Sequence, residues 1–146
     1  MSSMISLREQ LLCVSNHRFA SLLEFAVQVA GETAQTAKER DWTEQLHSFA
    51  EQAWPGIGFD LDQQFLSLDE KKFWARVFDD LGRRIFLRLI GRHDVTFWQS
   101  SAIGDAYIIA RMLAKSVQEV ELAWHPISEN SREGEQVTTG EINIQM

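Results

Sequence analysis

The feature that constrains this fold most is an apolar stripe between residues 68 and 90. Large apolar side chains recur there at spacings of four, three, four and four residues: Trp74, Phe78, Leu81, Ile85 and Leu89. This spacing places them on one face of an α-helix, because a helix has about 3.6 residues per turn. Ahead of the stripe, Ser67 and Glu70 form the pattern of a capping box. We therefore predict a core helix over 68–90.

A first helix is predicted over 7–30, where Ser6 and Glu9 form a capping pattern ahead of another apolar stripe. Cys13 falls in the middle of this helix and is expected to be a small, buried apolar residue. On such a helix Glu9, Cys13 and His17 would share one face, an arrangement that could activate a cysteine nucleophile. We favour the structural role, because nucleophilic cysteines usually lie at helix N-termini or in loops.

A second helix is predicted over 42–54, with an Asp41 and Glu44 capping pattern at its start, although the start can also lie earlier, within 33–40. Glu44 and His47 match half of the carboxylate and histidine pairing that di-iron helical bundles use. The chain has no second pair of this kind. A chance pair on a polar helix face is therefore the better interpretation.

The connection over 55–66 mixes glycines with apolar residues, so we expect it to be pinned to the core and to be able to form a short strand. Its large apolar residues are Phe59, Leu61, Phe65 and Leu66. Asp60 and Asp62 could ligate Mg²⁺ or Ca²⁺, but the further oxygen ligands of a calcium loop are missing. We therefore favour a solvated turn and predict no metal and no cofactor.

A fourth helix is predicted from about 95 to 124, with a seam that would lie along another helix at a shallow crossing angle. The seam residues alternate at four and three: Ala106, Ala110, Leu113, Val117, Val120 and Trp124. From residue 127 onward the sequence becomes polar and acidic. The predicted fold class is all-α, a single-domain bundle of about four helices over 1–126. A polar, acidic C-terminal tail follows over 127–146, able to form a short strand or hairpin with a partner.

Composition excludes several classes of protein. The single cysteine, an N-terminus without the pattern of a secretory signal, and the lack of any apolar run of membrane length predict a cytoplasmic protein with no membrane association. The net charge of −7 disfavours binding to nucleic acid. The sequence also lacks a phosphate-binding glycine loop, a Gly-x-Ser-x-Gly elbow, a His-Glu-x-x-His motif and paired Cys-x-x-Cys motifs.

Charge is distributed unevenly along the chain. Residues 71–92 hold seven basic and two acidic side chains, a local charge of +5 that leaves −12 elsewhere. The two aspartates stand four residues before Arg83 and Arg84, so we predict ion pairs along this helix. Arg88 and Arg92 would then remain free. With Arg84 they form a possible anion-binding face.

These observations favour a non-catalytic, protein-binding inhibitor of the immunity or antitoxin kind, which neutralises a basic partner such as a bacterial toxin. Exposed acidic residues and tryptophans are the predicted contacts with that partner. They are Trp54, Asp62, Trp98, Glu129, Glu133 and Glu135.

Two alternative functions stay open. The first is a small helical enzyme with a nonclassical site, built from Cys13, His17 and His47 or from the two loop aspartates, Asp60 and Asp62. The second is a regulatory domain that senses a small anion. Its predicted ligands are Arg84, Arg88 and Arg92.

The predicted core gives a first testable expectation. It consists of Leu23, Phe49, Trp74, Phe78, Leu81, Ile85, Leu113 and Val117. Truncating its central aromatic residue by Phe78→Ala should lower the free energy of unfolding by about 3–5 kcal/mol, because a cavity remains where the ring was. Urea denaturation followed by circular dichroism measures this loss. A change below about 1 kcal/mol would place Phe78 outside the core.

Overall fold

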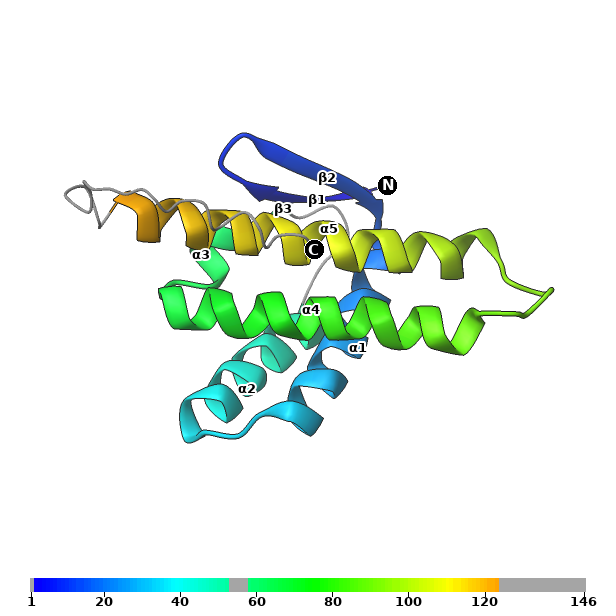
Figure 1. Cartoon of the computed structure of the whole chain (residues 1–146), viewed down its shortest axis with the longest axis horizontal. Coiled ribbons are helices and arrows are strands. Elements are labelled where there is room, and N and C mark those ends of the chain that lie inside the picture. Colours follow the sequence, from blue (N-terminus) through cyan, green and yellow to red (C-terminus); the bar gives the residue numbers. More distant parts are fainter. Residues whose placement is uncertain (1, 53–57, 124–146) are drawn as a thin grey trace, which may run out of the picture.

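The computed structural model describes residues 2–52 and 58–123. Within these ranges the chain forms β1 (Ser2–Leu7), β2 (Gln10–Ser15), α1 (Asn16–Thr33), α2 (Ala37–Gln52), β3 (Gly58–Asp60), α3 (Leu61–Gln64), α4 (Leu68–Leu89) and α5 (Phe97–Ala123). Helices α4 and α5 lie side by side, with the sheet beside α5 and with α1 and α2 beside α4 (Figure 1). The fold is therefore predominantly helical, but the prediction of an all-α fold is wrong because a three-stranded sheet is present.

The N-terminal segment departs most from the predicted helices. Residues 2–15 form an antiparallel hairpin in place of the first part of the helix predicted over 7–30. Ser6 therefore lies in a strand and caps no helix. The residue that caps α1 is Ser15, whose side-chain oxygen accepts a hydrogen bond from the amide of Arg18 at 3.2 Å.

The hairpin follows a period of two in burial. Ile5 and Leu7 are buried, whereas Met4 between them is 48% exposed. Arg8 and Glu9 form the turn, and Arg8 adopts a left-handed backbone with φ of 57°, as the tight turns of two-residue hairpins require. Strand β3 pairs in parallel with the other side of β1, so the sheet order is β2-β1-β3. Within the part of the chain that the structure describes, β2 is thus an edge strand.

Helix α4 confirms the prediction of a capped core helix. The side chain of Ser67 accepts a hydrogen bond from the amide of Glu70 at 3.0 Å, and the Glu70 carboxylate accepts one from the amide of Leu66 at 3.1 Å. Burial raises the pKa of the Glu70 carboxyl above its usual value, and the backbone hydrogen bonds at Leu66 and Ser67 oppose that rise. The cap thus keeps a buried carboxylate at the start of the helix.

Helix α2 begins at Ala37, within the earlier stretch that the prediction allowed, and the expected cap at Asp41 is wrong. The residue at the cap is Thr36, whose side-chain oxygen accepts a hydrogen bond from the amide of Glu39 at 3.1 Å. The carboxylate of Glu39 in turn accepts one from the amide of Gln35 at 2.8 Å. These two bonds hold Glu39 at the junction of α1 and α2.

The described part of the connection 55–66 contains the short strand β3, as expected. Phe59, Leu61 and Phe65 are buried, which confirms that this segment is pinned to the core, but Leu66 is 78% exposed. Six of the eight predicted core residues are buried, and the other two, Phe49 and Ile85, are partly buried. The predicted tail lies outside the described residues.

An aromatic cluster forms the centre of the core. The Trp74 ring stacks on Phe65, with centroids 5.3 Å apart and an interplanar angle of 17°, and meets Phe73 edge-on at 5.0 Å. Phe65 contacts Phe59, which in turn contacts Phe19 of α1. The cluster therefore ties the central helix to β3, to the segment after α3 and to α1.

Helix α5 packs along α4, as its seam predicted, and one glycine permits the close approach. A Cβ atom added to Gly82 would lie 3.0 Å from a ring carbon of Tyr107 on α5. An ion pair also fixes α5 to α1, because Arg18 Nε lies 3.0 Å from Asp105 Oδ2 and both side chains are largely buried. No helix in the described ranges has a stretch long and apolar enough to span a membrane.

The close approach at Gly82 gives a second prediction. Gly82→Ala gains roughly 1 kcal/mol of helix propensity, but its new methyl group crowds the ring of Tyr107. We expect the substitution to be about 1 kcal/mol more favourable in a Tyr107→Ala background than in the wild type. Chemical denaturation of the four proteins of this double-mutant cycle measures the coupling. Simple additivity would show that the ring does not exclude a side chain here.

Candidate functional site

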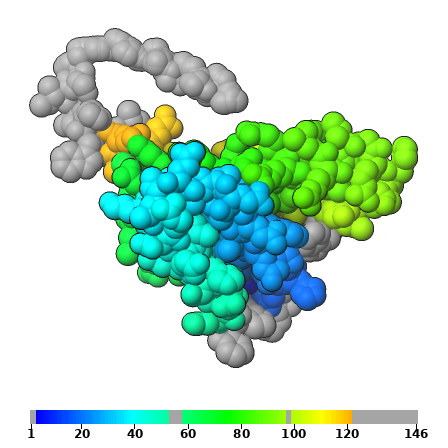
Figure 2. Space-filling model, turned by 90° about the horizontal axis from the view of Figure 1, so that it is seen from below, coloured from blue at the N-terminus to red at the C-terminus, as the bar shows by residue number. Residues whose placement is uncertain are grey.

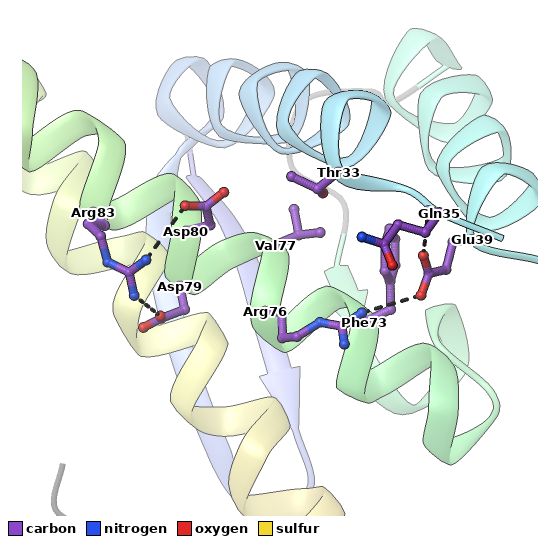
Figure 3. Close-up of a pocket in the computed structure, with 9 residues that line it drawn as sticks. All are labelled: Thr33, Gln35, Glu39, Phe73, Arg76, Val77, Asp79, Asp80 and Arg83. Atoms are coloured by element: carbon purple, nitrogen blue, oxygen red, sulfur yellow. Dashed lines mark hydrogen bonds and ion pairs between the residues drawn. The ribbon is translucent and has the colours of Figure 1, made fainter.

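A cleft of about 510 Å³ opens where the end of α1 and the start of α2 face α4 (Figure 3). Phe73 and Val77 of α4 supply its apolar lining, and both are buried. Thr33 closes the side formed by α1, and its hydroxyl donates a hydrogen bond to the carbonyl of Val29 at 2.9 Å. The cleft thus combines an apolar floor with polar walls.

Three carboxylates line this cleft: Glu39 from α2 and the consecutive Asp79 and Asp80 from α4. Glu39 is positioned by the cap of α2, and its side chain is only 17% exposed. Asp79 and Asp80 follow the buried Phe78 directly, so the amphipathic pattern of α4 places them beside the apolar floor. Carboxylates so placed can receive a cationic group whose apolar part rests on the floor.

Three arginines, Arg76, Arg83 and Arg84, pair with these carboxylates in the free protein. Arg76 reaches Glu39 at 3.3 Å, and Arg83 reaches Asp79 at 3.1 Å and Asp80 at 3.8 Å (Figure 3). The side chains of Arg76 and Arg83 are 70% and 59% exposed. Exposed ion pairs of this kind contribute at most about 1 kcal/mol each, so another cation can displace them.

The predicted ion pairs along α4 are confirmed, and Arg84 is more extensively paired than expected. Arg83 pairs with Asp79, and Arg84 pairs with Asp80 at 3.1 Å. Arg84 also reaches Glu32 of α1 at 2.6 Å, and this hydrogen bond is the main cause that raises the pKa of its guanidinium. Arg84 is therefore already occupied by carboxylates.

The expectation that Arg92 remains free is wrong, because it pairs with Asp94 at 2.8 Å. That contact raises the pKa of Arg92 and lowers the pKa of Asp94. Arg88 has no carboxylate partner among the residues that the structure describes. Of the three arginines of the predicted anion-binding face, two thus carry a counterion within the protein.

Of the residues predicted to contact a partner protein, the structure describes the side chain of Asp62 alone. Trp54, Glu129, Glu133 and Glu135 lie outside the described residues, and Trp98 lies in the first turn of α5, with its side chain outside them. Asp62 belongs to a charge network, because its carboxylate lies 2.6 Å from Lys71 Nζ and 3.7 Å from Arg8 Nε. The role of all these residues in binding stays a prediction.

The enzyme alternatives are not assembled as expected. Cys13 is exposed on β2 rather than buried in a helix, so Glu9, Cys13 and His17 lie on a turn, a strand and a helix and share no helix face. His47 lies 3.4 Å from Glu51 rather than from Glu44. Within residues 2–52 and 58–123, no group of three or more histidine, cysteine or acidic side chains is arranged to hold a metal.

Two surface features escaped the sequence analysis. The first is Glu39, whose place at a helix start is nevertheless indicated by the capping-box pattern of Thr36 and Glu39. Phe86, Leu87 and Ile90 are 45%, 60% and 62% exposed. They lie at the end of α4 (lime green in Figure 2), which projects beyond α1 and α2.

The exposure of the cleft arginines gives a third prediction. Arg83→Ala should lower the free energy of unfolding by less than about 1 kcal/mol, because its ion pairs are exposed. The matched substitution Arg18→Ala should cost about 3 kcal/mol, since it leaves the carboxylate of Asp105 buried without its counterion. Urea denaturation of both variants compares the losses. Equal losses would show that the cleft arginines are structural rather than displaceable.

Comparison of the chain with protein-family models, with curated proteins and with solved structures finds no match.

Proposed function

We propose that this protein is a non-catalytic inhibitor that binds another protein with a basic surface, and that the cleft receives a lysine or arginine side chain of that partner. One observation carries the proposal. The carboxylates of Glu39, Asp79 and Asp80 surround an apolar floor and are countered by exposed arginines.

The shape of the cleft suits a long basic side chain. Lysine and arginine have an apolar stem and a charged head, and they bury the stem while the head stays near charge or water. In the cleft the stem would rest on Phe73 and Val77, and the head would meet Asp79 and Asp80. The incoming cation would replace Arg83, whose own exposed pairs are weak.

The charge of the whole chain supports a basic partner. A net charge of −7 speeds the approach of a cationic protein at low ionic strength. Glu129, Glu133 and Glu135 remain the proposed contributors from the C-terminal segment. Toxins that act on nucleic acids need positively charged clefts, so an immunity or antitoxin role in the cytoplasm fits a protein of this charge.

The test is capture of partners from the native host with four forms of the protein as bait. We expect wild type and Glu24→Gln, an exposed acidic residue outside the cleft, to retain a basic protein that the double variant Asp79→Asn/Asp80→Asn loses at least tenfold. Arg83→Ala should bind that partner several-fold more tightly, because it removes the competing internal cation. The captured protein's activity should fall to zero at one equivalent of wild type.

Circular dichroism and melting temperature must be unchanged in the variants for this comparison. Retention of the partner by Asp79→Asn/Asp80→Asn would exclude the cleft as the contact site. Weaker binding by Arg83→Ala would show that this arginine itself contacts the partner. A captured partner that is acidic, or whose activity is unaffected, would contradict the proposed inhibition.

A further inference from the structure

We infer that two copies of this chain associate through the free edge of β2, in antiparallel pairing that joins their sheets into one of six strands. The inference is independent of the proposed function, because it uses a different surface. The sheet lies beside α5 (Figure 1), whereas the cleft is lined by the end of α1, the start of α2 and α4 and by none of the strand residues.

The outer edge of β2 offers backbone groups that pair with no other strand in the described ranges. Leu7 and Gln10 flank the two turn residues and face each other in the hairpin. In a turn of this kind the residue after the turn donates its amide hydrogen to the carbonyl of the residue before it. Because bonding alternates along an antiparallel pair, Gln10, Leu12 and Val14 direct their backbone groups toward β1. Leu11 and Cys13 direct theirs outward, and β2 pairs only with β1 among the described residues.

The strand lacks the devices that usually protect an edge. Natural edge strands carry lysines, prolines or bulges that prevent pairing with another chain. The sequence of β2 is QLLCVS, without a charge or a proline, and its register with β1 continues over six residue pairs without a bulge. A neutral strand can meet its own copy without repulsion, which is why we place a second copy here.

The outward face of the hairpin carries apolar side chains beside serines, and an apolar row on it continues across such a pairing. Met4 lies opposite Cys13 in the hairpin, and Leu11 is 59% exposed on the same face. Antiparallel pairing through outward backbone groups sets Leu11 of one copy opposite Cys13 of the other, about a two-fold axis at Leu12. A row of Met4, Cys13 and Leu11 side chains then crosses the interface, burying surface that the single chain exposes.

The interface is short, so the dimer is expected to be weak and its formation to depend on protein concentration. The test is sedimentation equilibrium of the full chain over about 5–500 µM. We expect the average mass to rise from 16.8 kDa toward twice that value. Leu11→Lys should keep the protein monomeric by placing like charges across the axis. Cys13→Pro should do the same, because it removes an outward amide that β1 does not use.

Cys13→Ser is the matched control and should dimerise like the wild type, since it keeps the outward amide. Both disruptive variants should retain the circular dichroism spectrum. Under mild oxidation Leu11→Cys should give a chain-to-chain disulfide with Cys13 of the second copy on a non-reducing gel.

Three results would overturn the inference. The first is a wild type that stays monomeric up to 500 µM; slow exchange of the Leu11 and Cys13 amides in that monomer would show another segment covering the edge. The second is a dimer that survives Leu11→Lys and Cys13→Pro. The third is a dimer in which the Leu11→Cys protein forms no cross-link to Cys13 of the second copy.

Discussion

The burial of Trp74 and the aromatic rings around it is the interaction on which the rest of the structure depends. Phe65, Phe73 and Phe78 contact this ring, and Phe59 extends the contacts to α1 and to the partly buried Phe49 of α2. Every helix except α5 therefore either carries a ring of this cluster or directly precedes one. Fully buried aromatic side chains supply much of the free energy of a core, so they decide where the central helix must lie.

The charged residues arrange themselves around this core mostly as pairs. Of the seven basic residues over 71–92, only Arg88 lacks a carboxylate partner within the described residues. The basic segment read from the sequence is thus not a free cationic face, because acidic residues from α1, α2, α3 and α5 meet it. Some of these ion pairs lie at the cleft, where α4 presents two aspartates and α2 presents Glu39 beside buried apolar side chains.

The cleft and the edge of β2 are formed by different elements, the cleft by α1, α2 and α4 and the edge by the N-terminal hairpin. Their physical character also differs. The cleft would recognise a partner by charge, since its carboxylates are held by a helix cap and by consecutive positions on α4. The strand edge would recognise a copy by backbone hydrogen bonds and a small apolar face, which carry no charge and depend little on salt.

The sequence by itself determined the helices whose apolar period and caps agree. For α4 the stripe through Trp74 and the box of Ser67 and Glu70 determined its place. For α5 the alternating seam predicted packing along another helix, and only the tertiary structure shows that this helix is α4. Only the tertiary structure decided whether the N-terminal segment forms strands or a helix, because the apolar residues over 2–15 fit a helical period nearly as well as an alternating one. Pairing with β3 and burial of Ile5 and Leu7 select the strands, and neither contact is visible along the chain. The cleft is likewise a product of packing, since Glu39 and Asp79 line one cavity only when α2 and α4 converge.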